Sequence, residues 1–205
     1  MVYKNFFYRS IFATILFILY LFSLNINNFL FILATLIYMI IIFECFLFFK
    51  RKFFLIISYL LISLLCFYAY FFIFFDFFLF NILMFVIILF DSFSYFTGLL
   101  FGKTYIFKKI SPKKTLEGYL GGGFFTNIII IAFLLLYKDN INIINILFLI
   151  NSIIIFSIAG DLTQSFFKRI NNIKNSSSYL PGHGGFFDRF DSFIPSIIFL
   201  LLYSI

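Results

Sequence analysis

Long apolar runs constrain this chain more than any other feature of its sequence. They lie at about 11–24, 29–49, 53–75, 77–90, 119–137, 141–159 and 193–205. Most of them approach the roughly 20 residues that a helix needs to cross membrane hydrocarbon. Only 11% of the residues are charged, compared with roughly 25% in soluble globular domains. The sequence therefore predicts an all-α integral membrane protein, a polytopic helical bundle of about seven transmembrane helices, with six to eight allowed.

Basic residues cluster before the first apolar run and after the second, fourth and sixth. The clusters are Lys4 and Arg9, Lys50 to Lys52, Lys103 to Lys114, and Lys168 to Arg189. Cytoplasmic loops carry such an excess of Lys and Arg, which predicts a cytoplasmic N-terminus and two cytoplasmic loops at 91–118 and 160–192. The net charge of +7 is then mostly a topology signal, and no nucleic-acid partner is expected.

The first apolar run follows two basic residues, as the apolar region of a signal peptide would. No small-residue cleavage site follows it, so we predict that it is a retained helix. The apolar runs and basic clusters divide the chain into N-terminal transmembrane helices at 1–90 and a C-terminal membrane domain at 91–205, which carries both predicted loops.

The first predicted loop begins with "DSFSYFTGLLFGK". Asp91, Ser94, Tyr95 and Gly98 follow the i, i+3, i+4, i+7 spacing, which predicts one polar helical face. One interpretation is a helix end that meets water at the membrane interface. The other is a functional site, because an unpaired carboxylate in hydrocarbon costs several kcal/mol.

The same loop continues "FKKISPKKTLEGYLGGG". Ser111 can cap a helix that begins at Pro112, which would leave free N–H groups beside Lys113 and Lys114. With Thr115, these residues predict a site for a phosphate-like anion. Lys108 and Lys109 are interpreted as charges that keep the loop inside. The small residues that follow are predicted to let helices approach closely; they are Gly118, Gly121, Gly122 and Gly123.

The second predicted loop, "GDLTQSFFKRINNIKNSSSYLPGHGGFFDRFDS", gathers many of the charges of the chain. If the sixth helix continues past the membrane, one face carries Asp161, Gln164, Ser165 and Lys168. "NNIKNSSSYL" is interpreted as a flexible polar stretch. It leads to "PGHGG", a turn that lets backbone amides approach a ligand and that places His183 beside glycines.

The helix expected after this turn places Asp188 and Asp191 three residues apart on one side, with Arg189 on another. If Asp161 converges with both, three carboxylates lie near three basic residues, Lys168, Arg169 and Arg189. Carboxylates bind hard cations such as Mg²⁺, which often keeps substrate phosphates as further ligands and offsets charge on phosphoryl oxygens. The alternative is a set of charge pairs that join the two loops.

These residues resemble the phosphatidate cytidylyltransferases, also called CDP-diacylglycerol synthases. The family's C-terminal pattern is matched at Ser165, Lys168-Arg169, Lys174-Asn175, His183-Gly184-Gly185, Asp188-Arg189 and Asp191. Its upstream segment is similar to Asp91-Ser92, Phe101-Gly102-Lys103 and Ser111 to Gly118. The resemblance covers about half the chain, residues 91–192. Departures from the residues common in the family occur at Gln164, Asn175 and Leu116.

The resemblance implies a Mg²⁺-dependent transfer from CTP to phosphatidate, giving CDP-diacylglycerol and pyrophosphate, at the cytoplasmic face of a bacterial inner membrane. The implied catalytic residues are Asp161, Lys168, Arg169, Asp188, Arg189 and Asp191, with the three aspartates as metal ligands. The implied substrate-binding residues are Ser111, Lys113, Lys114, Thr115, Ser165, His183, Gly184 and Gly185. A second cation and a homodimer are left open.

Two other functions fit parts of the sequence. One is a CTP-dependent transferase or kinase that acts on another lipid, because acyl chains of different lipids contact similar apolar walls. The other is a small membrane transporter whose ion path is lined by Glu44, Asp76 and Asp91. The transporter is less favoured, because the predicted topology puts Asp76 outside and Asp91 inside.

Overall fold

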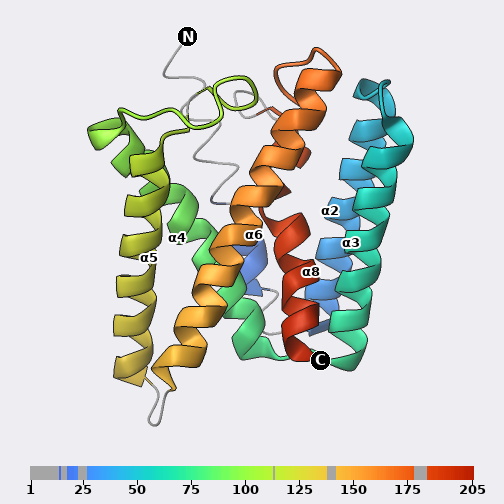
Figure 1. Cartoon of the computed structure of the whole chain (residues 1–205). Helices are drawn as coiled ribbons and strands as arrows, with labels where there is room; N and C mark the ends of the chain where they lie inside the picture. The colour runs from blue at the N-terminus through green and yellow to red at the C-terminus, as the bar shows by residue number, and fades with distance from the viewer. Residues whose placement is uncertain (1–13, 15–17, 23–26, 113, 138–141, 178–183) are drawn as a thin grey trace. The chain divides into compact units, whose positions relative to one another are not determined.

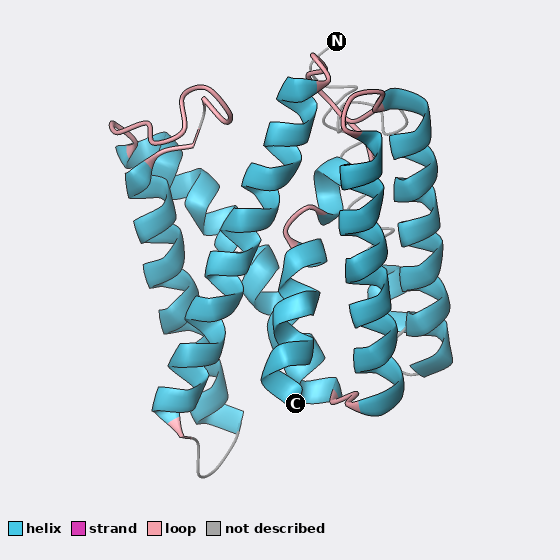
Figure 2. Cartoon of the chain, turned by 45° about the vertical axis from the view of Figure 1, so that its right-hand side comes forward, coloured by secondary structure: helices cyan, strands magenta, loops and turns pink. Residues whose placement is uncertain are grey.

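A computed structural model describes residues 14, 18–22, 27–112, 114–137, 142–177 and 184–205 (Figure 1). Within these ranges the regular secondary structure is helical, as Figure 2 shows, apart from isolated bridge residues such as the Tyr105–Thr115 pair. The helices are α2 (Asn27–Phe48), α3 (Phe53–Ile73), α4 (Phe77–Phe101), α5 (Leu116–Tyr137), α6 (Ile143–Ile170), α7 (Phe187–Phe190) and α8 (Phe193–Ser204). The predicted all-α class is confirmed.

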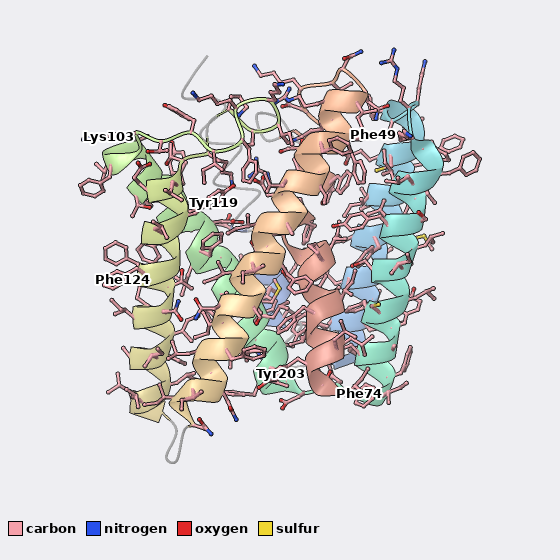
Figure 3. The ribbon with its side chains drawn as sticks, viewed as in Figure 1. Phe49, Phe74, Lys103, Tyr119, Phe124 and Tyr203 are labelled. Atoms are coloured by element: carbon pink, nitrogen blue, oxygen red, sulfur yellow. The ribbon has the colours of Figure 1, made fainter. Side chains whose placement is uncertain are left out.

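Five of these helices are long and apolar enough to cross a membrane. The candidate spans are Phe29–Phe48, Phe53–Ile73, Phe77–Phe101, Leu116–Leu136 and Ile143–Ile170, and α8 is a shorter apolar helix. Their outer surfaces carry large apolar side chains, such as Phe54 with an exposed fraction of 87%, and Figure 3 shows Phe124 projecting outward from α5. Such surfaces suit lipid better than water, so the chain is a polytopic integral membrane protein. The apolar run at 11–24 lies mostly outside the described residues.

The chain divides into two compact units, each made of two chain segments. Unit 1 comprises Met1–Leu65 and Phe166–Phe190, and unit 2 comprises Cys66–Ser165 and Asp191–Ile205. Helices α3 and α6 therefore each contribute residues to both units. Some of the residues predicted to form the active site belong to unit 1, and the others belong to unit 2.

The core of unit 1 joins α2, α3 and the segment that follows α6. Tyr38 on α2 and Ser63 on α3 share a buried hydrogen bond of 2.6 Å between their hydroxyl oxygens. Phe49, just after α2, packs on Phe187 of α7 with ring centroids 5.8 Å apart, and both side chains are buried. These contacts hold α7 against the end of a membrane helix.

The core of unit 2 is built on the close packing of α4 against α5. The Thr97 hydroxyl on α4 donates to the Gly118 carbonyl on α5 at 3.1 Å. A methyl group on Gly121 would lie 2.7 Å from Thr97 Cβ, and one on Gly122 would lie 2.8 Å from Ser94 Cβ, so the helices could not pack this closely with larger residues. The predicted close-packing role is confirmed for Gly118, Gly121 and Gly122.

Three local predictions about helix faces are wrong. A methyl group on Gly123 would meet nothing within 4 Å, so this glycine lies off the α4 contact. Tyr95 is 66% exposed whereas Ser94 is buried, so the two do not share one environment on α4. Asp188 and Asp191 do not share one helix either, because α7 ends at Phe190 and a turn precedes α8.

The two predicted loops are shorter than expected, because α4 continues to Phe101 and α6 to Ile170. Polar residues at a membrane interface do not interrupt the backbone hydrogen bonds of a helix. The continuation of α6, on which the predicted polar face of Asp161 and Lys168 depends, is confirmed. The helical face predicted at the opening of the first loop likewise lies on a continuous helix, α4.

The sequence predicted that a helix begins at Pro112. This prediction is wrong, because helix α5 begins at Leu116. Ser111 and Pro112 form a turn instead, which the bond from Lys114 N to Ser111 O closes at 3.3 Å, and proline suits the second position of such a turn. Thr115 takes the capping role, since its Oγ1 accepts from Gly118 N at 3.2 Å. Ser111 and Thr115, which were predicted to bind substrate, therefore both have local structural roles.

Candidate active site

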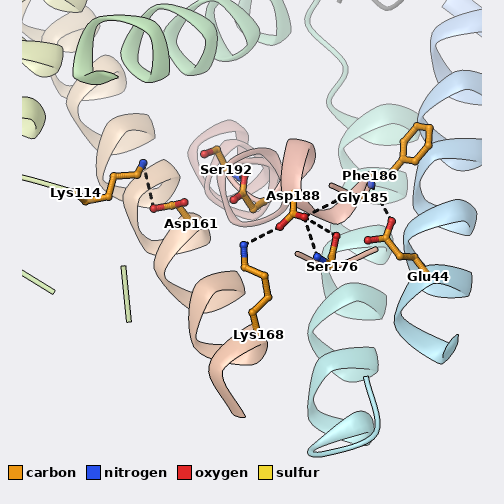
Figure 4. A network of polar contacts seen from close by, with 10 residues as sticks. Glu44, Lys114, Asp161, Lys168, Ser176, Gly185, Phe186, Asp188 and Ser192 are labelled. Atoms are coloured by element: carbon orange, nitrogen blue, oxygen red, sulfur yellow. Dashed lines mark hydrogen bonds and ion pairs between the residues drawn. The ribbon is translucent and has the colours of Figure 1, made fainter. Parts of the chain in front are cut away.

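Asp188 on α7 is the centre of a polar cluster in unit 1 (Figure 4). Its Oδ1 accepts a hydrogen bond from Lys168 Nζ at 2.7 Å. Its Oδ2 accepts from Ser176 N at 2.9 Å, Ser176 Oγ at 3.0 Å and Gly185 N at 3.2 Å. The Lys168 and Asp188 side chains are only 15% and 10% exposed. Because a carboxylate offers about four lone-pair sites, these contacts satisfy Asp188 within the protein.

The two glycines of the turn before α7 let acidic side chains approach the backbone. Gly184 has a φ of +84°, a left-handed conformation that favours glycine. A methyl group on Gly184 would collide with Asp188, and one on Gly185 would collide with Glu44 and Ser176. The sequence predicted a close approach at this turn. In the structure, the groups that approach are carboxylates of the protein itself.

Glu44 and Ser176 belong to this cluster, although neither was predicted to be in the active site. Glu44 is fully buried, and its Oε2 accepts from Phe186 N at 2.8 Å. Ser176 is also fully buried, so at Ser176 the interpretation of "NNIKNSSSYL" as a flexible stretch is wrong. A single acid inside a long apolar run was the available signal for Glu44.

A second charged cluster lies in unit 2, where Lys114 Nζ is 3.2 Å from Asp161 Oδ2 (Figure 4). Lys114 Nζ also lies 5.7 Å from the centre of the Tyr119 ring, which adds a cation–π contact. Burial disfavours the charged form of Lys114, but the nearby Asp161 and Asp91 outweigh this and hold its pKa above the usual value. Lys114 therefore stays protonated at neutral pH.

Asp191 lies in the electrostatic field of the same cluster. Burial raises its pKa well above the ordinary value, Asp161 and Asp91 raise it further, and Lys114 partly opposes them. Its Oδ1 accepts a hydrogen bond from Ser192 N at 2.9 Å. Asp161 and Asp91 thus both disfavour a negative charge on Asp191, and the Lys114 ammonium group opposes them.

Comparison with known proteins identifies the family. The sequence profile of the Cytidylyltransferase family matches residues 5–205. The chain belongs to this family. The resemblance seen in the sequence is thereby confirmed at the level of the family.

Several relatives of this cytidylyltransferase-family chain are named phosphatidate cytidylyltransferase. The chain is 40% identical over 117 residues to the protein from Staphylococcus aureus (strain COL), which covers 56% of this chain and 45% of the relative. It is 40% identical over 114 residues to the Bacillus subtilis (strain 168) protein, with coverages of 54% and 42%. It is 38% identical over 115 residues to the Haemophilus influenzae (strain Rd) protein, which covers 53% of this chain and 39% of the relative. The matched region spans less than half the length of each relative.

The predicted site residues of this family member fall into both units. Unit 1 contains Lys168, Arg169, Gly184, Gly185, Asp188 and Arg189, whereas unit 2 contains Ser111, Lys114, Thr115, Asp161, Ser165 and Asp191. Lys113 and His183 lie outside the described residues. The convergence of Asp161 with Asp188 stays a prediction, because each belongs to a different unit.

The acidic residues of unit 2 could hold a metal ion only together with other ligands. The described part of the chain has no group of three or more His, Cys, Asp and Glu side chains that could hold a metal ion. Mg²⁺ is commonly bound by one or two carboxylates together with waters and substrate phosphates, so it does not require such a group. Burial is the main cause of the raised pKa of Asp191, and Asp161 and Asp91 raise it further; a bound cation would relieve this second, repulsive part. Asp161 and Asp191 therefore suit Mg²⁺.

Proposed function

We propose that this family member transfers the CMP moiety of CTP to phosphatidate, giving CDP-diacylglycerol and pyrophosphate for phospholipid biosynthesis. The observation that carries the proposal is the 40% identity over 117 residues to a phosphatidate cytidylyltransferase. The two charged clusters support it, because a polyphosphate substrate needs both basic residues and a cation site. The membrane helices support a lipid as the second substrate.

In the proposed reaction, a phosphate oxygen of phosphatidate attacks the α-phosphorus of CTP. The bond from this phosphorus to the bridging oxygen of the β-phosphate breaks, and pyrophosphate leaves with the bond electrons. No covalent intermediate with the enzyme is required. Catalysis would depend on positioning and on electrostatic stabilisation, as in other phosphoryl transfers.

The clusters suggest how the charged residues divide the work. Asp161 and Asp191 would hold Mg²⁺, which would offset charge on the phosphates and on the leaving group. Asp188 is proposed as a further ligand. Since four hydrogen bonds already engage its carboxylate, this role requires one donor to move away. Lys168 is the best candidate, because its ammonium group could then contact a substrate phosphate.

We further propose about seven transmembrane helices, a cytoplasmic N-terminus, and an active site on the cytoplasmic face of a bacterial inner membrane. The alternation of basic loops supports this orientation. CTP is a soluble nucleotide made in the cytoplasm, which agrees with a site on that side. Cysteines introduced at residues 103–114 and 168–189 should resist an impermeant reagent in intact cells and react in opened ones. Labelling in intact cells would contradict the orientation.

The decisive assay uses protein purified in detergent, phosphatidate, Mg²⁺ and CTP labelled in its α-phosphate. The proposal predicts a labelled lipid whose formation requires phosphatidate. Parallel reactions with a lipid alcohol and with an isoprenoid phosphate test the alternative that another lipid is the acceptor. No labelled product from any acceptor, with folded and monodisperse protein, would contradict the transferase.

The transporter alternative gains no support from its three acidic residues. Asp76 caps α4, since its Oδ1 accepts from Phe78 N at 2.7 Å and from Leu79 N at 3.4 Å. Asp91 lies fifteen residues further along the same helix, a rise of about 22 Å. Asp76 therefore has a structural role at the start of α4, about 22 Å along the helix axis from Asp91.

A further inference from the structure

Glu44 is a buried acid in a membrane helix, and the proposed reaction does not use it. It lies four residues before the end of α2, and its side chain is fully buried. The surrounding residues of this helix are almost all apolar. An acid is costly in such a place unless it makes specific contacts, so the contacts of Glu44 indicate its role.

These contacts lead to the turn that precedes α7. Oε2 of Glu44 accepts from Phe186 N at 2.8 Å, across 142 positions of the chain. Phe186 also starts α7, because its carbonyl accepts from Arg189 N at 2.9 Å and from Phe190 N at 3.1 Å. Glu44 thus holds the residue from which the Asp188-bearing helix begins.

The other side of the Glu44 carboxylate borders the contacts of Asp188. A methyl group on Gly185 would collide with both Glu44 Oε1 and Ser176 Oγ, so these two oxygens lie on one side of Gly185. Gly185 N and Ser176 Oγ are two of the groups that donate to Asp188 Oδ2. The backbone of the turn is therefore held between two carboxylates, one from α2 and one from α7.

We propose that Glu44 is a positioning residue for the reaction. From its place in a membrane helix it fixes the Gly185–Phe186 backbone, and through this turn it sets the position of Asp188. Its reach and its acceptor oxygen are what matter, rather than its negative charge. The inference rests on the proposed function, because it assigns Asp188 to the transfer reaction.

The test compares Glu44→Ala, Glu44→Gln and a matched control, Tyr38→Phe. Gln keeps an oxygen that can accept from Phe186 N, and its amide can donate to Ser176 Oγ, whereas Ala offers no acceptor. Tyr38→Phe removes a buried hydrogen bond of the same helix, the one to Ser63, without touching the turn. For each protein, kcat and the KM for CTP and phosphatidate are measured, together with hydrogen–deuterium exchange of peptides covering residues 184–190.

Glu44→Ala should lower kcat about 10–100-fold, as loss of a group that orients a ligand residue commonly does, with smaller changes in KM. Amides of the turn should exchange faster in this variant. Glu44→Gln should restore slow exchange and most of the turnover, and Tyr38→Phe should leave kcat and the exchange of the turn unchanged. Unchanged kcat in Glu44→Ala would overturn the inference, as would a Gln variant no better than Ala or an equal loss in Tyr38→Phe.

The exchange measurement separates this inference from the proposed function. If the wild-type protein forms no CDP-lipid, the proposed function fails, yet exchange still reports whether Glu44 holds the turn. If the wild-type protein is active and Glu44→Ala exchanges at the wild-type rate, the positioning role fails while the function stands.

Discussion

Lys168 Nζ lies 2.7 Å from Asp188 Oδ1, across 20 positions of the chain. The contact joins the last turns of α6 to α7 within unit 1. Both residues were predicted from the sequence to act on metal and phosphate. In the structure they neutralise each other, so any catalytic role of either one begins with the opening of this pair.

Asp188→Asn should lose both turnover and stability. Asn keeps one acceptor oxygen, but its amide would face donors that now bind a carboxylate, and Lys168 would lose its counter-charge. Breaking one side of a buried ion pair costs about 3–5 kcal/mol, so the thermal unfolding temperature in detergent should fall. CDP-lipid formation at several Mg²⁺ concentrations should show no full rescue. If Asp188→Asn is inactive but as stable as the wild-type protein, Asp188 acts in the reaction and does not stabilise the fold.

Lys114→Ala should lower kcat and stability, whereas Lys113→Ala should mainly raise the apparent KM. Lys114 pairs with Asp161, so its removal leaves Asp91, Asp161 and Asp191 without this counter-charge and should lower kcat and thermal stability together. Lys113 is predicted only to hold a substrate phosphate, a charged contact of about 1.5–3 kcal/mol. Its loss should raise the apparent KM and be largely overcome by more CTP or phosphatidate. Equal effects on both kcat and KM in the two variants would contradict this division.

The raised pKa of Asp191 predicts a pH dependence of stability in Mg²⁺-free buffer. The ordinary pKa of an aspartate is 3.8, and the pKa of Asp191 in the folded protein is higher. At a pH between these two pKa values, Asp191 is protonated in the folded protein and ionised in the unfolded chain. The contribution to stability is complete below 3.8 and is lost as the pH rises through the folded pKa. Asp191→Asn cannot ionise, so it should unfold at a higher temperature than wild type at neutral pH. A lower unfolding temperature at neutral pH would contradict the prediction.

Features that depend on local sequence were predictable. A membrane helix needs only a long apolar run, which is why α2 and α3 match the runs at 29–49 and 53–75. The shared face of Asp161 and Lys168 was predicted on the condition that α6 continues, and the helix does continue to Ile170. The break between α7 and α8 also had a local signal, because Pro195 lies in the first turn of α8, where proline is well tolerated.

Features that depend on tertiary contacts were not predictable in this way. Ser111 and Thr115 were both suitable caps for α5, and the choice rests on contacts made across the loop. Glu117 accepts from Lys103 N and Thr104 N at 3.1 Å, and Leu116 N donates to Thr104 O at 2.9 Å. The contact between Glu44 and Phe186 is still more distant in the chain. Spacing within one segment contains no information about such pairs.

Two neighbouring glycines of α5, Gly122 and Gly123, differ in what surrounds them. A methyl group on Gly122 would lie 2.8–2.9 Å from Ser94 Cβ, Cα and N. Two of these are backbone atoms, so Gly122→Ala requires α4 to move. Overpacking of this kind costs about 1–3 kcal/mol. The thermal unfolding temperature should therefore fall, and CDP-lipid formation should fall with it, because α4 carries Asp91 and α5 follows Lys114.

Gly123→Ala is the matched control for this change. A methyl group at this position would meet nothing within 4 Å, and alanine favours a helix over glycine by about 1 kcal/mol. The control should therefore unfold at the wild-type temperature or slightly above it, with normal turnover. If Gly122→Ala is as stable as Gly123→Ala, the close contact between α4 and α5 is not required for the fold. If both variants are equally destabilised, the cost comes from the glycine substitutions themselves and not from the contact with Ser94.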